Sequence, residues 1–256
     1  MRYLPIPLLL LSCSFLAAGQ DWKVLPLVVN GKIDPAWKQV DWGGFIVDKN
    51  PTALRTQPAP QGMGLLVYTA AKFGDCQLRI VYRSEKPHSN SGVLIRIDDG
   101  ILNKIGEKTN GVEREKDGGL SPAMVARMKN SSEQQIGAWY AVHHGFEVQI
   151  EDAGDDWHRT GSIYSLARAE SLPPMPASGW RTMIITFEGD HVTVDVDGKT
   201  VTKFDSASPN LPPRRTWSEP IREIKRPTHG YIGLQNHDPG DLVWFKEVAV
   251  RDLPKK

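Results

Sequence analysis

The stretch HVTVDVDGKTVTKF, residues 191–204, decides the fold class of this chain. Its first half alternates valine with polar residues, and this period of two indicates a strand with one buried face. Asp197-Gly198 then supplies the turn typical of a two-residue β-hairpin. The stretch therefore predicts two antiparallel strands joined by a tight turn.

Similar β-rich runs lie on both sides of this hairpin, and turn signals separate them. They cover residues 64–70, 77–83, 93–97, 146–150, 181–187, 231–236 and 242–251. No long segment carries a helical period, and no repeat recurs at a fixed spacing. Many strands with turns between them predict an all-β sandwich or barrel.

Three segments lack this pattern. Residues 98–142 are polar, glycine-rich and charged, and they predict a long loop with one short helix around residues 122–129. Residues 206–228 hold five prolines, which excludes a central strand. Residues 20–62 are interrupted by Trp and Pro and predict one or two edge strands. Long loops on a rigid sandwich usually shape a binding face.

Composition narrows the class of protein. The chain has 256 residues, of which 40% are hydrophobic, and this is enough for one substantial core. Its net charge of +1 gives no electrostatic reason to expect nucleic acid as a partner. We expect no organic cofactor and infer no protein partner, whereas a divalent metal stays open.

The N-terminus has the pattern of a secretory signal peptide. Arg2 precedes a mostly apolar run, and small residues follow it. A signal peptide over residues 1–19 would leave one β-sandwich domain over residues 20–256, exported to the periplasm or the cell exterior. The alternative is a lipoprotein-type signal ending at Cys13. No other apolar run approaches the ~20 residues of a membrane-spanning helix.

Loss of that signal would leave Cys76 as the one cysteine of the domain. An internal disulfide and a cysteine cluster for zinc are then excluded. Cys76 begins a strand-like run, and we predict a small buried hydrophobe rather than a reactive thiol.

One predicted sheet face carries polar side chains. In GFEVQIED, alternation puts Glu147, Gln149 and Glu151 on the face opposite the apolar residues. By the same rule, Arg96 lies opposite the apolar residues of its strand, and further arginines lie outward on the strand at 77–83. If these strands are neighbours, carboxylate, amide and guanidinium groups share one face that suits sugar hydroxyls. The alternative is a solvated face with ordinary salt bridges.

Histidines near these carboxylates are candidates for acid–base chemistry or metal binding. His143 and His144 precede the strand FEVQI, and His237 follows the strand YIGLQN. Their spacing matches no metal motif. His158 is interpreted as a surface residue without a role.

Four longer segments occur together in the chain. They are NSGVLIRI (90–97), AVHHGFEVQIEDAGDDWHRTGSIYSL (141–166), GWRTMIITFEGDHVTVDVDGKTV (179–201) and GYIGLQNHDPGDLVWFKEVAVRDL (230–253). In content and order they resemble the 3-keto-disaccharide hydrolase domain family. The resemblance covers about residues 64–253, and only a weak likeness around residues 30–37 extends toward the N-terminus.

The resemblance implies a fold and an activity. The fold is a concanavalin A-like jelly roll, an all-β sandwich of two antiparallel sheets with long loops and at most short helices. The activity is cleavage of glycosides that are already oxidised to a ketone at the 3-position. The matched motif positions are Asn90, Arg96, Glu147, Gln149, Asp152, Tyr164, Gln235 and His237. The long connection over residues 98–142 departs from the pattern and would reshape or cap a pocket.

The first functional hypothesis is therefore an enzyme acting on 3-keto-glycosides. The ketone acidifies the hydrogen on the adjacent carbon, so a base can remove it, the glycosidic oxygen leaves, and water then adds. The candidate bases are Glu147 and His144. The candidate acids are His237 and Tyr164.

The other matched residues are assigned to substrate binding. They are Arg96, Gln149, Asn90, Asp152 and Gln235. Arg96 with Gln149 would hold the enolate or hydroxyls, unless a divalent metal replaces Arg96. Ordinary hydrolysis by paired carboxylates, with Glu147 and either Glu151 or Asp152, is an alternative.

The second hypothesis is a non-catalytic, lectin-like module that binds carbohydrate. Trp139, Trp157 or Trp180 would then stack on sugar rings beside the polar residues. Pocket shape discriminates between the two hypotheses. A deep site that unites Glu147 with His237 favours catalysis, and a flat aromatic face favours binding.

Overall fold

The computed structural model describes residues 21–50, 52–108, 113, 115–117, 119–129 and 137–253. The predicted signal peptide, and with it Cys13, lies outside the described residues. Within them, no helix is long and apolar enough to cross a membrane.

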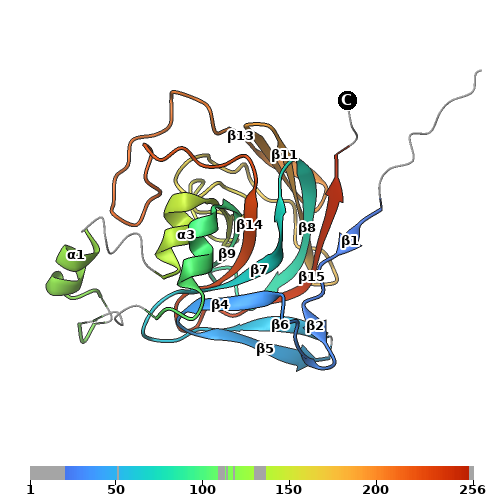
Figure 1. The fold of residues 1–256 in the computed structure, drawn as a ribbon, viewed down its shortest axis with the longest axis horizontal. Coiled ribbons are helices and arrows are strands. Elements are labelled where there is room, and N and C mark those ends of the chain that lie inside the picture. The colour runs from blue at the N-terminus through green and yellow to red at the C-terminus, as the bar shows by residue number, and fades with distance from the viewer. Residues whose placement is uncertain are drawn as a thin grey trace, which may run out of the picture.

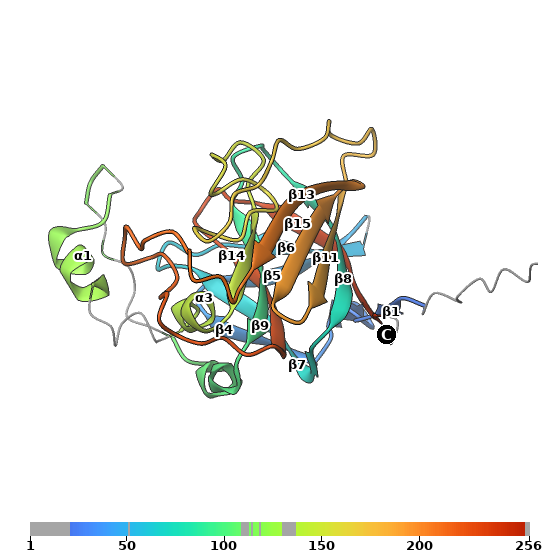
Figure 2. The same ribbon diagram turned by 90° about the horizontal axis from the view of Figure 1, so that it is seen from above.

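Two antiparallel sheets pack face to face as a β-sandwich, which confirms the predicted fold class (Figures 1 and 2). The larger, eight-stranded sheet runs β13 (Lys199–Asp205), β12 (His191–Val196), β11 (Arg181–Glu188), β8 (Cys76–Ser84), β15 (Val243–Asp252), β6 (Thr52–Gln57) and β5 (Gly44–Lys49), with β1 (Lys23–Val24) also pairing with β15. The smaller sheet runs β10 (Phe146–Ile150), β9 (Ser91–Ile97), β14 (Gly230–Asn236), β7 (Gly64–Phe73) and β4 (Trp37–Asp41). A separate hairpin pairs β2 (Val28–Val29) with β3 (Lys32–Ile33).

The core between the sheets follows the alternation of the strands. The three valines of β12 are fully buried, while the residues between them are partly exposed. Burial of one such side chain stabilises the fold by about 1.5–3 kcal/mol. Strands β12 and β13 form the predicted hairpin, and both Asp197 and Gly198 have positive φ in its turn. Cys76 is buried and free, as predicted, and burial raises its thiol pKa to about 12.

A second apolar cluster covers part of the outer face of the smaller sheet. Leu65, Val67 and Leu94 of the sheet belong to one cluster with buried residues of α3 (Trp139–His144). The 3-10 helix η1 (Asp99–Lys104) adds Ile101 to it. Helix η1 lies in the segment predicted as a loop, residues 98–142, and α3 begins in it and extends two residues beyond; the segment also contains the predicted helix, α1 (Pro122–Met128). Helix α3 stands beside β9 and β14 in Figure 1 and forms one boundary of the cavity described below.

The N-terminal segment contributes more strands than the one or two edge strands predicted. It forms β1 to β6, and β6 lies inside the larger sheet between β15 and β5. The prediction was wrong because these strands have two to six residues each. Such short runs give too few positions for a period of two to show.

A β-bulge near the end of β9 reverses the alternation there. Tyr231 of β14 pairs with Ile97, but Gly233 pairs with Leu94, so β9 carries one extra residue over this interval. Arg96 lies in the bulge with φ of 52°, in the left-handed region. Ile97 consequently packs in the outer cluster rather than in the core between the sheets.

Candidate active site

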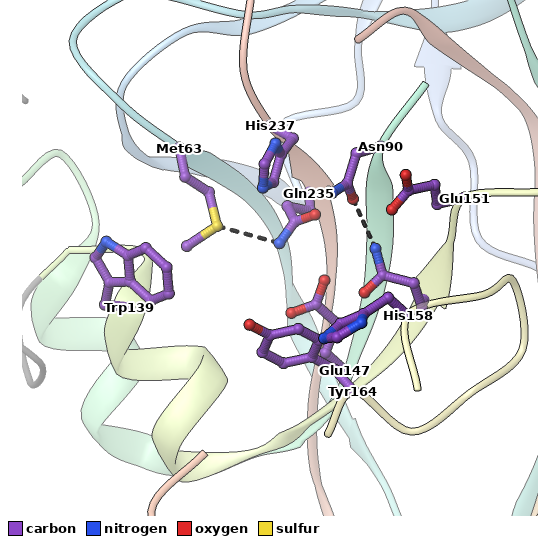
Figure 3. A pocket seen from close by; sticks show the side chains of 10 residues that line it. Met63, Asn90, Trp139, Glu147, Glu151, His158, Tyr164, Gln235 and His237 are labelled. Atoms are coloured by element: carbon purple, nitrogen blue, oxygen red, sulfur yellow. Dashed lines mark hydrogen bonds between the residues drawn. The ribbon is translucent and has the colours of Figure 1, made fainter. Parts of the chain in front are cut away.

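A cavity of about 160 Å³ opens on the outer face of the smaller sheet, beside α3 (Figure 3). It lies where β10 and β14 end and where β7 and β9 begin. Its lining residues are Met63, Asn90, Trp139, Glu147, Gln149, Glu151, His158, Tyr164, Gln235 and His237. Six of the nine residues predicted for the site are therefore brought together, namely Asn90, Glu147, Gln149, Tyr164, Gln235 and His237.

Strand β10 supplies the floor of the cavity. As the alternation predicts, Glu147, Gln149 and Glu151 share the outer side, while Phe146, Val148 and Ile150 belong to the core cluster. Gly92 of the adjacent strand pairs with Gln149 in register. A Cβ at Gly92 would lie 2.5 Å from Oε1 of Glu147, so glycine makes the room that this carboxylate occupies.

Glu147 is an unusual carboxylate, because it is only 4% exposed and no arginine or lysine forms an ion pair with it among the described contacts. Burial raises its pKa from 4.5 to about 7, against the opposing effects of His237 and of a hydrogen bond from Gln235. Figure 3 shows the carboxylate pointing into the cavity near Tyr164 and Gln235. Such a group can gain and lose a proton near neutral pH.

His237 stands on the turn after β14, across the cavity from Glu147 (Figure 3). Its Nδ1 lies 3.1 Å from Oδ2 of Asp241. Burial lowers the pKa of this imidazole, but the Asp241 hydrogen bond and the charges of Asp238, Asp241 and Glu147 raise it more, so the net pKa is raised. The cationic form of His237 is thus more favoured than that of a free histidine, and it lies opposite a carboxylate.

Tyr164 reaches the cavity because the segment TGSIY runs along the free edge of β10. The amide of Tyr164 donates to the carbonyl of Glu147 at 2.9 Å, and the amide of Gln149 donates to Ser162 at 3.0 Å. Burial raises the Tyr164 pKa, with a smaller opposing effect from a hydrogen bond to Ser218. The phenol therefore stays protonated at neutral pH and can donate a hydrogen bond.

Two amide side chains offer further polar atoms. Gln149 donates from Nε2 to Asn90 at 2.7 Å, and Gln235 donates to the thioether of Met63 at 3.1 Å, a weak acceptor. The Oε1 atoms of Gln149 and Gln235 are buried and have no hydrogen-bond partner within the described part of the chain. Unsatisfied buried polar atoms are costly and point to a ligand that completes them.

The loop over residues 206–228 forms the wall behind Trp139. Trp217 packs edge-on against Trp139 with ring centroids 4.9 Å apart. Glu219, almost fully buried, accepts hydrogen bonds from Arg215 and Arg222 and so fixes the loop next to Trp217. This proline-rich segment is thus held by ion pairs that converge on a buried carboxylate, one from the exposed Arg215 and one from the mostly buried Arg222.

Arg96 does not belong to the cavity, and its prediction is corrected. The bulge in β9 turns its side chain inward, where Nη2 donates to the carbonyl of Gly189 at 2.7 Å and lies 3.6 Å from Asp75. The guanidinium also stacks over Phe187. The arginines of β8 are likewise absent from the cavity, because β8 belongs to the larger sheet.

His144 and Asp152 are also placed outside the cavity. His144 is the last residue of α3. Its Nδ1 lies 2.9 Å from Oδ2 of Asp98, and its ring stacks on that of Tyr140. Asp152 accepts from Nε of Arg181 at 2.8 Å in a buried cluster that includes Asp197. Both predictions are corrected for the same reason, since each side chain is engaged by a structural partner.

Four lining residues are not among the nine predicted ones, and of these Glu151 is predicted only as an alternative carboxylate for ordinary hydrolysis. His158, interpreted as a residue without a role, lines the cavity with its ring 5.4 Å from that of Tyr164. The sequence predicts Trp139 only as a stacking platform, and no motif in it indicates Met63. The available signal for His158 is its place in the family-like stretch 141–166, six residues before Tyr164. Trp157 and Trp180, the other two suggested platforms, carry Arg168 and Arg83 over their rings.

Within the described residues, no group of three or more His, Cys, Asp or Glu side chains converges as a metal-ligand set. The sequence-based suggestion of a divalent metal stays untested.

Comparison with known proteins agrees with the motifs. A family model of the 3-keto-alpha-glucoside-1,2-lyase-like domain matches residues 21–251, which includes the N-terminal strands. No curated protein matches the chain.

Two similar crystal structures are candidate glycosyl hydrolases of Parabacteroides distasonis ATCC 8503. One is 19% identical with a TM-score of 0.59 and covers 91% of this chain and 100% of that chain. The other is 17% identical with a TM-score of 0.56 and covers 88% and 92%. At these identities the likeness shows the fold alone.

Proposed function

The chain belongs to the family of 3-keto-alpha-glucoside-1,2-lyase-like domains, and from that premise we propose that it cleaves 3-keto-glycosides by elimination followed by hydration. The observation that carries the proposal is the Glu147 carboxylate. It is buried in a cavity, its pKa is raised to about 7, and it faces a histidine whose pKa is also raised. A base and an acid of this kind are what the reaction needs.

In the first step Glu147 takes the proton from carbon 2 of the sugar, next to the ketone. The electron pair of that C–H bond forms the enolate, and the bond from carbon 1 to the glycosidic oxygen then breaks. His237 donates a proton to the departing oxygen, which leaves as an alcohol. The remaining ring is an unsaturated ketone, to which water adds to give the free 3-keto-sugar. In the addition, the water oxygen bonds to carbon 1 while neutral His237 takes its proton, and carbon 2 takes a proton from Glu147, which exchanges with water in the open cavity; both residues are thereby restored.

The choice of residues follows from protonation states. Glu147 replaces His144 as the base because His144 is held by Asp98 outside the cavity. His237 is a better acid than Tyr164, because an imidazolium releases its proton far more easily than a phenol whose pKa burial has raised. The amide of Gln235 and the Tyr164 hydroxyl are assigned to hydrogen bonds with the enolate and the sugar hydroxyls.

The experiment compares wild type and Glu147→Gln on 3-keto-trehalose and 3-keto-lactose, with and without a chelator. Glu247→Gln is the matched control, because Glu247 pairs with Arg79 on the larger sheet. We expect turnover by wild type and control, and its loss in Glu147→Gln. Unoxidised trehalose and lactose should not react, since carbon 2 is not acidic without the ketone. Cleavage of the unoxidised sugars would favour ordinary hydrolysis instead.

A lectin-like role is the second candidate, and Trp139 at the cavity is the observation that favours it. An indole beside polar groups is a common sugar-binding surface. Calorimetry with the same sugars separates the two roles. Binding that is unchanged by Glu147→Gln, with no turnover of either keto-sugar by wild type, would support the lectin-like role. A carboxylate that is buried with no arginine or lysine partner among the described residues favours the enzyme, because pure binding does not require that cost.

A further inference from the structure

The turn after β14 holds His237 near two carboxylates, one of which is closer to the ring than the other. Oδ2 of Asp241 lies 3.1 Å from Nδ1, and Oδ2 of Asp238 lies 3.8 Å away. Asp241 is 19% exposed and Asp238 is 43% exposed. Asp241 is therefore the hydrogen-bonding partner, and Nε2 is the ring nitrogen left for the cavity.

Asp241 is itself fixed by a strand of the other sheet. Thr56 of β6 is fully buried, and its hydroxyl donates to the carbonyl of Asp241 at 3.0 Å. The same hydroxyl accepts from the amide of Val243 at 3.0 Å. The turn is closed by the amide of Asp241, which donates to the carbonyl of Asp238 at 3.0 Å, and Gly240 supplies the positive φ of 97° that the turn requires.

We propose that Asp241, anchored by Thr56, is a positioning residue that fixes the ring and the charge of His237 opposite Glu147. This inference rests on the proposed function, because the task it assigns to Asp241 is to support His237 as the acid of that reaction. Asp241 itself does not line the cavity. The carboxylate holds Nδ1 in its protonated form, so that Nε2 faces the leaving oxygen. A histidine without this partner would be free to rotate and to lose its charge.

The charged groups around His237 determine in which direction its pKa changes when the Asp241 charge is removed. Asp238 and Asp241 face the ring from its own turn, and Glu147 faces it from β10. Glu151 also lines the cavity, and its charge interacts with His237 as well as with His88 and His158. Loss of the Asp241 charge should lower the His237 pKa. A neutral His237 would no longer lower the Glu147 pKa, which should then rise.

The test uses Asp241→Asn, with Asp238→Asn as the matched control. Thr56→Val is a second variant, which removes the anchoring hydroxyl, with its bonds to Asp241 and Val243, and keeps the Asp241 carboxylate. The readouts are the pH profile of kcat/KM and an NMR titration of the His237 ring. In Asp241→Asn we expect the acidic limb to move to higher pH and the basic limb to lower pH. At the optimum, kcat/KM should fall about tenfold or more. Asp238→Asn should move both limbs less, and Thr56→Val should move them in the same direction as Asp241→Asn.

The titration separates this inference from the proposed function. An unmoved His237 pKa in Asp241→Asn, or a loss of rate with both limbs unmoved, would overturn the positioning role. A lowered His237 pKa supports it, even if wild type cleaves no keto-sugar, in which case only the proposed function fails. If Asp241→Asn does not fold, Thr56→Val decides, and a His237 titration identical to wild type would then overturn the inference.

Discussion

Replacement of Glu147 by Gln tests activity and stability together. The two side chains have nearly the same shape, so the change removes the charge and leaves the packing against Gly92 intact. The wild-type carboxyl holds its proton more tightly in the fold than in the unfolded chain, because burial raises the pKa from 4.5 to about 7. Stability from this group is therefore present below pH 4.5 and is lost as pH rises through about 7.

The magnitude follows from that difference in pKa. At 1.36 kcal/mol per unit, ionised Glu147 lowers the free energy of unfolding by up to about 3 kcal/mol at pH 8. Glu147→Gln should then be more stable than wild type at pH 8, with a melting temperature higher by about 5–10 °C. At pH 4.5 the two should melt almost together. Loss of the base should meanwhile lower kcat by about 10²- to 10⁴-fold.

The assay is thermal melting at pH 4.5, 6 and 8, beside turnover of 3-keto-trehalose on the same samples. Glu247→Gln, on the outer face of the larger sheet, serves as control and should show neither effect. A Glu147→Gln protein that turns over like wild type refutes the catalytic role. A melting temperature no higher than wild type at pH 8 refutes the account of burial.

Three further substitutions probe the surroundings of the site. Gly92→Ala should lower kcat/KM roughly 10- to 100-fold, because the new Cβ displaces the Glu147 carboxylate; steady-state kinetics check this, and unchanged kcat/KM would contradict it. Glu219→Gln should destabilise the chain by about 3 kcal/mol and raise KM more than it lowers kcat, since it loosens the loop that carries Trp217. Denaturant melts and steady-state kinetics measure the two effects, and an unaltered KM would argue against this loop as a wall of the cavity. Arg96→Lys should cost about 1–3 kcal/mol of stability through its lost bond to Gly189 while leaving turnover unchanged; a large loss of turnover would return Arg96 to the site.

The sequence predicts the strands well because their signal is local. The period of two in β10 correctly puts Glu147 and Gln149 on one side of the sheet. The motif at the end of β14 likewise indicates His237. Glu147 and Gln149 need only their own strand to be placed on the correct side, whereas His237 lies on the turn after β14 and is indicated by the motif alone.

Three residues are placed by structure that no local pattern shows: Arg96 is predicted in the site but lies outside it, Trp139 is predicted only as a stacking platform, and His158 is predicted to have no role. The bulge that turns Arg96 inward arises from pairing of β9 with β14, more than 130 residues later, and no local pattern reveals it. Trp139 lies on a six-residue helix inside a polar segment, too short to show a helical period. His158 reaches the cavity through the fold of a turn rather than through alternation.

The central claim is that Glu147 removes the proton from carbon 2, and the fate of that hydrogen tests it most directly. A 3-keto-disaccharide deuterated at carbon 2 would be cleaved in ordinary water, and the product examined by NMR at short times with a no-enzyme control. The account predicts that deuterium at carbon 2 is lost to solvent in the cleaved sugar with wild type, and that neither loss nor cleavage occurs with Glu147→Gln. Cleavage with the deuterium fully retained at carbon 2, and at the same rate as the undeuterated sugar, would contradict it.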